Sequence, residues 1–204
     1  LVSLPTVPVS APSHLGLAPL TLGGPTLWRL DVKEVSNPLL QELADATGTM
    51  VSLVIRDDLS MLYIENCRSA SSIVTLHLGI GSRIPIGPTA GGRAYLAGVT
   101  EGVRRSVLER LQALDPAGFP RLEKGLRRAL SDLAQYGCVT SFGDWKKEIN
   151  GIAVPMALGP GLPLMVVSAA GSALYFPQET MMRAPRRKLR APVQNIAARY
   201  GAGS

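Results

Sequence analysis

Apolar residues in the first part of the chain change from helical to strand spacing near Gly48. Between residues 35 and 43 they recur every three or four positions, which predicts a helix over 31–47 that Gly48 ends. Pro38 lies inside this pattern and lacks the N–H that an interior helical position needs. We therefore expect the helix to begin afresh near Asn37, with Pro38 at its first position.

Shorter apolar runs of β-prone residues follow this helix. The runs at 50–56 and 61–66 are separated only by Asp57–Ser60, so they predict a β-hairpin. A third run at 73–78 predicts another strand, which the glycine at 79 ends. The chain up to this point therefore contributes one helix and three strands.

Helical spacing returns in the middle of the chain and gives way to strands again before the C-terminus. Helices are predicted over 89–97, 101–114 and 121–136. Strands are predicted over 138–142, 149–158 and 164–170, before a last helical region over 178–200 that is bent at its prolines. This order of helix, strands, helices, strands and helix favours an α+β fold with a largely antiparallel sheet.

The composition is that of an ordinary globular chain with an unusual beginning. Apolar residues make up 46% and charged residues 18% of the 204 positions. Residues 1–30 are rich in Pro, Ser, Gly and Leu and carry no charge before Arg29, so we expect a linker or irregular arm there and a folded domain over 31–204. No winged helix-turn-helix is visible in that arm.

Cysteine usage and hydropathy indicate a cytoplasmic protein without a membrane segment. Cys67 and Cys138 form no motif, which favours a reducing compartment. The beginning of the chain lacks the basic region of a signal peptide. Prolines and glycines interrupt the long uncharged stretch at 151–177, so it predicts two buried strands and a turn instead of a membrane span.

The net charge of +6 is concentrated near the C-terminus, where no acidic residue follows Glu179. Such a basic segment could contact phosphates, or it could be the solvated face of a helix. No aromatic residues are interleaved with the basic ones for base stacking, and prolines interrupt the run. The second interpretation is therefore favoured.

The segment PIGPTAGGRAYLA at 85–97 is the strongest candidate for a binding site. Thr89 can cap the helix that follows, and the first N–H groups of a helix are unpaired and attract anions. The backbone amides of Ala90 and Gly91 could therefore hold a carboxylate. Alternatively, the glycines only permit a tight turn and Thr89 only caps the helix.

Residues for catalysis or for a cofactor are scarce. The same segment approaches a P-loop, but Arg93 and Ala94 stand where Lys and Ser/Thr would bind phosphate and Mg²⁺. His14 and His77 are far apart in the sequence and predict neither a metal site nor a catalytic triad. We therefore predict no enzymatic activity, no metal and no cofactor.

Several stretches in series resemble the effector-binding domain of the isocitrate-lyase-regulator (IclR) family of bacterial transcription factors. They run in the order expected for the family, with few gaps, and cover about residues 14–200. The matching stretches are HLGLAPLTLGG (14–24), NPLLQELADATGTMVSLVI (37–55), LYIENC (62–67), GSRIPIGPTAGGRAYLA (81–97), LAQYGCVTSFGDWKKEINGIAVPM (133–156) and VVSAAG (166–171).

The resemblance implies a GAF-like or profilin-like sheet of about six strands with a ligand cavity on one face. It further implies a homodimer or homotetramer that senses a small organic acid and binds operator DNA through a winged helix-turn-helix that would precede residue 14. Ligand-contacting positions of the family fall on Thr89, Ala90, Gly91, Ser141, Gly151, Ser168 and Ala170. The hydroxyls of Thr89 and Ser168 would bind the remaining oxygens of the ligand.

The chain departs from the family pattern at several of these positions. A common acidic cluster becomes SFGDWKK at 141–147, one strand serine is replaced by Ala170, and Gly151 makes space. These changes favour a larger or more apolar ligand than a two- or three-carbon acid, which Trp145 could contact. Alternatively, the domain is a GAF-like dimerisation module whose pocket is vestigial.

Overall fold

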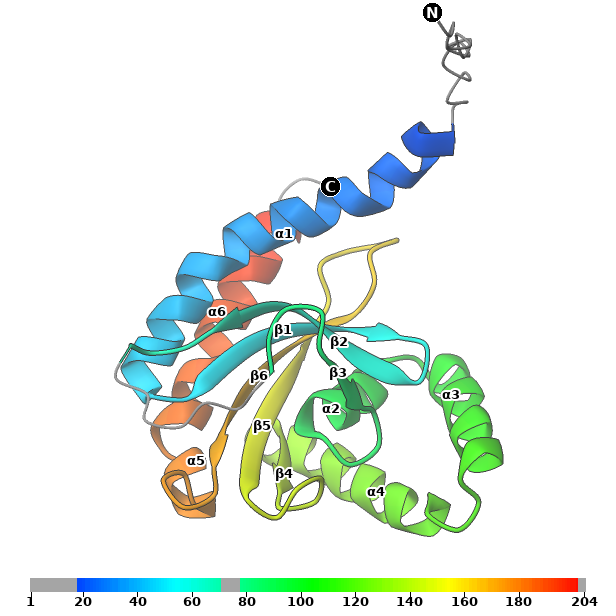
Figure 1. The fold of residues 1–204 in the computed structure, drawn as a ribbon, viewed down its shortest axis with the longest axis vertical. Coiled ribbons are helices and arrows are strands. Elements are labelled where there is room, and N and C mark those ends of the chain that lie inside the picture. The colour runs from blue at the N-terminus through cyan, green and yellow to red at the C-terminus, as the bar shows by residue number, and fades with distance from the viewer. Residues whose placement is uncertain (1–17, 71–77, 202–204) are drawn as a thin grey trace, which may run out of the picture.

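A six-stranded antiparallel sheet lies between two layers of helices (Figure 1). The computed structural model describes residues 18–70 and 78–201, with side chains from Asp31 onward. Its strand order is β3-β2-β1-β6-β5-β4. The strands are β1 Met50–Asp57, β2 Ser60–Cys67, β3 Arg83–Pro85, β4 Val139–Phe142, β5 Ile149–Met156 and β6 Met165–Ser172. The predicted α+β class with about six antiparallel strands is confirmed.

Different helices cover the two faces of the sheet. On one face lie α1 (Ala18–Thr47), α6 (Ala184–Gly201) and the four-residue α5 (Gln178–Met181). The opposite face is covered by the nine-residue α2 (Ala90–Gly98), with α4 (Phe119–Tyr136) packed against it. The remaining helix, α3 (Glu101–Leu114), lies at the edge of this second layer (Figure 1).

Side chains alternate between the two faces along each strand, as the two-residue period of a strand requires. In β6, Met165 and Val167 pack under α1 and α6, whereas Val166 packs on the side of α2. The same alternation in β5 sends Ile152 to the first face and Ala153 to the second. Two separate apolar clusters result, one for each helical layer.

A β-bulge in the pairing of β1 with β2 breaks this alternation in β2, where one residue is left unpaired because Leu53 pairs with Glu65 and Val54 with Tyr63. Tyr63 packs with the cluster on the α2 side, but Cys67, four residues later, packs with the cluster on the α1 side. Because of the bulge, the side chain of Cys67 at the end of β2 points to the opposite face of the sheet from that of Tyr63.

The first helix begins earlier than the sequence predicted. It runs without interruption from Ala18 through Pro38 to Thr47, so both the predicted fresh start near Asn37 and the irregular conformation of residues 18–30 are wrong. Val32 is fully buried, which shows that tertiary packing holds the helix well before the proline. Burial of an apolar face can offset one missing helical hydrogen bond. Residues 1–17 lie outside the described part of the chain.

Most other predicted elements are confirmed, with boundaries that differ by one or two residues. The predicted strand at 73–78 falls mainly on residues 71–77, which lie outside the described residues, and β3 was not predicted. The last helical region is divided into α5 and α6, and Pro192 lies inside α6. Among the helices of the described residues, none combines the length and the apolar character that crossing a bilayer requires.

Candidate functional site

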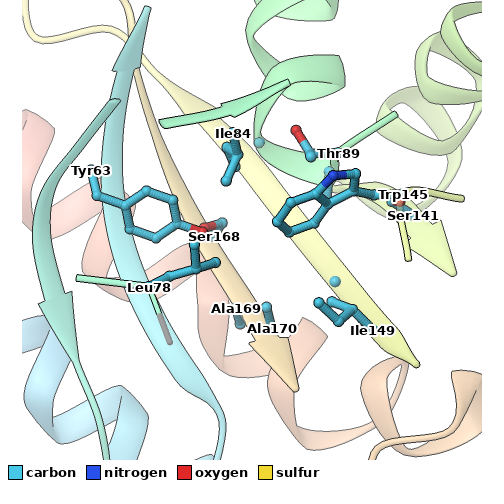
Figure 2. Close-up of a pocket in the computed structure, with 13 residues that line it drawn as sticks. Tyr63, Leu78, Ile84, Thr89, Ser141, Trp145, Ile149, Ser168, Ala169 and Ala170 are labelled. Carbon is cyan, nitrogen blue, oxygen red and sulfur yellow. The ribbon is translucent and has the colours of Figure 1, made fainter. Parts of the chain in front are cut away.

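A cavity lies between the first turn of α2 and the sheet strands beneath it (Figure 2). The space between atoms here is about 430 Å³, part of which is open to solvent, and about 40 Å³ is wide enough for the centre of a water-sized sphere. All of the residues predicted to form a ligand site contribute to its wall: Thr89, Ala90, Gly91, Ser141, Gly151, Ser168 and Ala170. The most distant of these positions, Thr89 and Ala170, are 81 residues apart in the sequence, and the structure brings them together.

The register of the sheet explains why the strand residues of this group meet. Ser141 of β4 pairs with Gly151 of β5, which pairs in turn with Ala170 of β6. Directly opposed residues on adjacent antiparallel strands point to the same face. These positions therefore form one row across the sheet. The first residue of α2 lies above this row, as shown by the distance of 3.5 Å between a Cβ built at Gly151 and Cβ of Ala90.

Thr89 is the N-cap of α2. Its Oγ1 accepts a hydrogen bond from the amide of Gly92 (3.1 Å) and donates one to the carbonyl oxygen of Pro85 (2.7 Å). Gly92 must be glycine, because a Cβ there would lie 2.0 Å from the carbonyl oxygen of Ile86. These contacts hold the loop before α2 tightly against the start of the helix.

The amides of Ala90 and Gly91 are the first two helical N–H groups and line the cavity. Neither donates to an acceptor among the described residues. A buried amide without a partner is costly, and the positive end of the helix adds to its attraction for an anion. The buried start of α2 therefore offers two unpartnered main-chain donors in the cavity wall, where the sequence analysis expects a carboxylate to bind.

Two of the predicted side-chain donors are already used within the protein. Thr89 donates to Pro85, and Ser141 Oγ donates to the carbonyl oxygen of Pro88 at 2.8 Å. A hydroxyl carries one proton, so neither can also donate to a carboxylate in this conformation. The predicted hydrogen bond from Thr89 to a ligand would require its hydroxyl to leave Pro85, whereas the hydroxyl of Ser168 has no partner among the described residues and is able to donate.

Tyr63 of β2 is a wall residue that the sequence analysis missed (Figure 2). It is 4% exposed, and its hydroxyl has no hydrogen-bond partner among the described residues. Burial raises its pKa to about 12, so the hydroxyl stays neutral and can donate. The two-residue period of the run at 61–66 could have placed Tyr63 beside Met61 on one face, but not on the face that holds the cavity.

Among the described residues that line the cavity, none has a charged side chain. Its walls are Leu78, Ile84, Ile149 and the half-buried Trp145, together with the small and hydroxyl-bearing residues already described. Trp145 thus lines the pocket, one of the two interpretations of the sequence. An anion here would be held by backbone amides and neutral hydroxyls, which suits one negative charge on an otherwise apolar molecule.

The groups considered for catalysis lie elsewhere. Cys67 and Cys138 pack in the cluster on the α1 side, and burial raises the pKa of each thiol to about 11. Arg93, at the position of a P-loop lysine, is buried in an ion pair with Asp144. Within 18–70 and 78–201, His, Cys, Asp and Glu side chains form no group of three that could hold a metal, and both histidines considered, His14 and His77, fall outside those ranges.

Sequence relatives of the chain are bacterial transcriptional regulators. It is 26% identical over 193 residues to the HTH-type transcriptional regulator TsaQ1/TsaQ2 of Comamonas testosteroni, covering 94% of this chain and 69% of the relative. Residues 25–198 match the family model described as the C-terminal domain of bacterial transcriptional regulator IclR.

Solved structures share the fold. The crystal structure of an IclR-family transcriptional regulator from Brucella abortus superposes with a TM-score of 0.79 at 32% identity, covering 89% of this chain and 68% of that one. An IclR homolog from Microbacterium hydrocarbonoxydans, complexed with 4-hydroxybenzoate, gives a TM-score of 0.66 at 21% identity, covering 85% of this chain and 70% of that one. With its antiparallel sheet and the cavity beneath α2, the chain belongs to the IclR family of bacterial transcriptional regulators, and contains its C-terminal, effector-binding domain.

Proposed function

We propose that the domain senses an organic acid with one carboxylate and an apolar body. The observation that carries this proposal is the pair of unpartnered amides at Ala90 and Gly91, two residues that line a cavity whose described wall residues are all uncharged. The carboxylate binds to these amides, and Trp145 and Ile149 contact the apolar body. An acid of the size of 4-hydroxybenzoate, the ligand of the Microbacterium homolog, is consistent with this chemistry.

The hydroxyls of Ser168 and Tyr63 define the second half of the recognition. Both belong to buried residues of the cavity wall, and neither hydroxyl has a partner among the described residues. A hydroxyl or carbonyl on the ligand would satisfy one or both of them, which lowers the free energy of the complex relative to a purely apolar ligand. Among the described residues that line the cavity there is no cationic side chain to pair with a second carboxylate, so we expect monocarboxylates to bind more tightly than dicarboxylates.

In this proposal, ligand binding changes the affinity for DNA by thermodynamic linkage, and the domain carries out no reaction on the ligand. A ligand that prefers one quaternary arrangement of a homodimer or homotetramer shifts the population toward that arrangement and changes the affinity of a winged helix-turn-helix for operator DNA. Such couplings are typically about 1–3 kcal/mol. In this proposal the protein is cytoplasmic, is not an enzyme, and contacts the operator through a module other than residues 31–204.

The anion site can be tested by removing one backbone donor. Ala90 is the first helical residue of α2, and Thr89 before it has the extended conformation (φ −89°, ψ 150°) that precedes a proline. Ala90→Pro therefore deletes the N–H at a position where proline suits a helix. We expect isothermal titration with 4-hydroxybenzoate to show at least a tenfold loss of affinity in this variant.

A matched control exists in α3. Glu101 is likewise the first helical residue and follows the extended Thr100 (φ −61°, ψ 155°), but it is exposed and is not part of the cavity wall. Glu101→Pro should leave the affinity unchanged. The uncharged 4-hydroxybenzamide should bind the wild type much more weakly than the acid, and equal binding of the two would contradict the anion site.

The second candidate function is a dimerisation module with a vestigial pocket. The observation in its favour is that only about 40 Å³ of the cavity, whose walls include the rings of Tyr63 and Trp145, is wide enough for the centre of a water-sized sphere (Figure 2). A thermal-shift series with monocarboxylic acids separates the two functions. Ligand binding raises the melting temperature, and a flat response across benzoate, 4-hydroxybenzoate, phenylacetate and pyruvate would favour the dimerisation module.

A further inference from the structure

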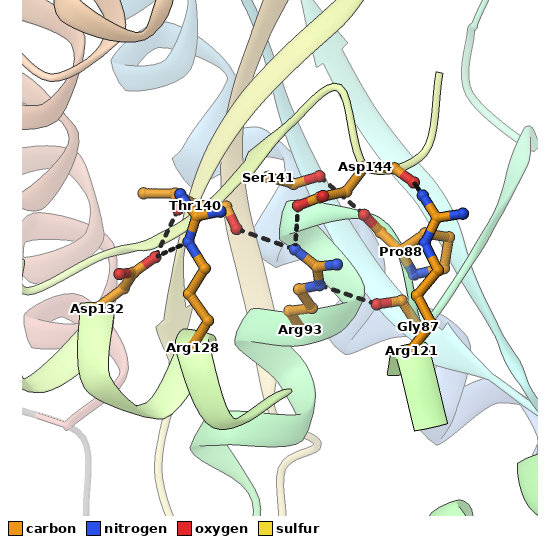
Figure 3. Close-up of polar contacts among 9 residues, drawn as sticks. All are labelled: Gly87, Pro88, Arg93, Arg121, Arg128, Asp132, Thr140, Ser141 and Asp144. Carbon is orange, nitrogen blue, oxygen red and sulfur yellow. Dashed lines mark hydrogen bonds and ion pairs between the residues drawn. The ribbon is translucent and has the colours of Figure 1, made fainter. Parts of the chain in front are cut away.

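Arg93 of α2 is buried to 4% exposure and points away from the cavity, toward the loop between β4 and β5 (Figure 3). Its Nη1 lies 2.6 Å from Oδ2 of Asp144 in that loop. Its Nε donates to the carbonyl oxygen of Gly87 at 3.0 Å, and Nη1 also donates to that of Thr140 at 3.4 Å. One guanidinium thus joins the loop before α2, the strand β4 and the loop that follows it.

The helix α4 packs closely against this guanidinium. Gly125 of α4 packs against it so closely that a Cβ there would lie 2.6 Å from Nη2 of Arg93. Arg121, one turn earlier on α4, donates from Nη2 to the carbonyl oxygen of Asp144 at 3.1 Å. Both the side chain and the backbone of Asp144 are therefore held, from α2 and from α4 respectively. We call Arg93, Arg121 and Asp144 the loop clamp.

The residue after Asp144 is Trp145, which forms part of two walls at once. It lines the effector cavity, and on its other side it lines a groove of about 670 Å³ between the 83–88 segment and the α3–α4 hairpin. Space for an indole is thus present outside the cavity. Beside the indole, only about 40 Å³ of the cavity is wide enough for the centre of a water-sized sphere.

We propose that Arg93 and Asp144 are positioning residues that hold Trp145 against the effector cavity. The proposal rests on the function proposed above and adds its control element. An entering acid shifts the indole toward the groove while the indole keeps its contact with the apolar body of the acid, and the loop clamp limits how far the backbone of the 143–148 loop follows. The clamp thereby sets the rates at which the acid enters and leaves, and it joins the occupied cavity to α2 and α4.

The position of Trp145 can be measured without any effector. The chain contains two tryptophans, so Trp28→Phe leaves Trp145 as the single indole. In this background Asp144→Asn removes the charge that Arg93 pairs with, while Gly87 and Thr140 still accept from the guanidinium. We expect the Stern–Volmer constant for quenching by acrylamide to rise at least twofold.

The controls separate this effect from general loosening. Glu101→Gln removes the carboxylate that pairs with Arg104, and Arg104 still donates to the carbonyl oxygens of Leu96 and Val99. This change matches Asp144→Asn but lies far from Trp145 in the sequence, and it should leave quenching unchanged. Asp144→Glu restores the carboxylate and should return quenching toward that of the parent. Arg121→Gln removes only the contact to the backbone of Asp144 and should raise quenching less than Asp144→Asn does.

Binding of 4-hydroxybenzoate adds a second measurement, in which we expect Asp144→Asn to raise the dissociation rate about fivefold in stopped-flow experiments. An unchanged Stern–Volmer constant in a folded Asp144→Asn variant would overturn the clamp. If that variant fails to fold, the exposed Arg121→Gln decides in the same way. If the parent binds no acid in the titrations above, the proposed function fails, whereas the quenching result still tells whether the clamp positions Trp145.

Discussion

The two faces of the sheet are built for different purposes. The face under α1 and α6 is filled by a continuous apolar cluster that includes fully buried Leu40, Met165 and Ile196. The face under α2 contains the cavity with its row of hydroxyls, while both faces include an ion pair with a buried partner, Lys33–Glu65 under α1 and Arg93–Asp144 beside α2. Both faces use the same strands with alternate side chains, so the difference comes from the helices above them.

The orientation of the helices decides whether the space above a face of the sheet is filled by side chains or contains a cavity. The long helices α1 and α6 lie along the sheet and press their sides onto it (Figure 1). The short α2 instead begins over the row of Gly151 and Ala170, which places its first amides inside the protein. The start of α3 has the same orphan amides, but Thr100 and Glu101 are exposed and water can satisfy them. An unpartnered helix start is thus informative only where it is buried.

The largest effect on stability is expected on the filled face. Leu40→Ala removes a fully buried side chain between α1 and the sheet, and such truncations cost about 2–5 kcal/mol. Denaturation in urea should show a loss of this size, while the affinity of the folded protein for 4-hydroxybenzoate stays unchanged. A loss of affinity without a loss of stability would show that the two faces are not separate in function.

The thiols of the filled face predict a dependence of stability on alkaline pH. Burial raises the pKa of Cys67 and Cys138 to about 11, above the value of 9.0 for an exposed thiol. The folded state therefore holds protons that the unfolded state releases, so this contribution is complete below about pH 8 and falls as the pH rises toward 11. Between pH 8 and 10 the free energy of unfolding should fall by about 1 kcal/mol per thiol.

A double variant, Cys67→Ala with Cys138→Ala, supplies the control for that measurement. It should be less stable at pH 8 and should show a flatter decline up to pH 10, where the raised pKa of Tyr63 contributes little. Equal slopes in the variant and the wild type would mean that other groups cause the decline.

On the cavity face, filling space should affect binding more than stability. Gly151→Val places its Cβ at ordinary contact distance from Ala90 (3.5 Å) and Ala170 (3.8 Å), and its methyl groups occupy the cavity. We expect the affinity for 4-hydroxybenzoate to fall at least tenfold, about 1.4 kcal/mol, with the melting temperature close to that of the wild type. Unchanged affinity would place the ligand outside this cavity.

The smallest expected effect concerns the neutral hydroxyls. Tyr63→Phe removes a donor that has no partner among the described residues, so the free protein should lose little stability. The affinity for 4-hydroxybenzoate should fall by about 0.5–1.5 kcal/mol, whereas that for benzoate should stay the same. Equal losses for both acids in a calorimetric titration would show that the ring of Tyr63 matters and its hydroxyl does not.

How much of the site could be predicted differs from residue to residue. Thr89 and the glycines after it form a local motif, so their cap and helix start were predictable from neighbouring residues. Ser141, Gly151 and Ala170 come together through strand register, which no local pattern contains, and they were found only through the resemblance to the family.

Three features were beyond the reach of a single sequence. The pairing of Arg93 with Asp144 joins residues 51 positions apart. The bulge in β2 changes the face to which side chains at the end of this strand point, although the residues themselves alternate regularly. The early start of α1 depends on the burial of Val32 against the rest of the protein, which outweighs the local effect of Pro38. In each case a distant contact decides what local preference leaves open.

The pair of free amides at Ala90 and Gly91 has a consequence for how such a domain can change over time. Main-chain groups survive nearly every amino-acid replacement, and proline is the exception. Substitutions in the walls can therefore reshape the hollow for a new molecule while the grip on its acidic group persists. Related domains could therefore come to detect different compounds without first having to evolve a new way to hold the acidic group.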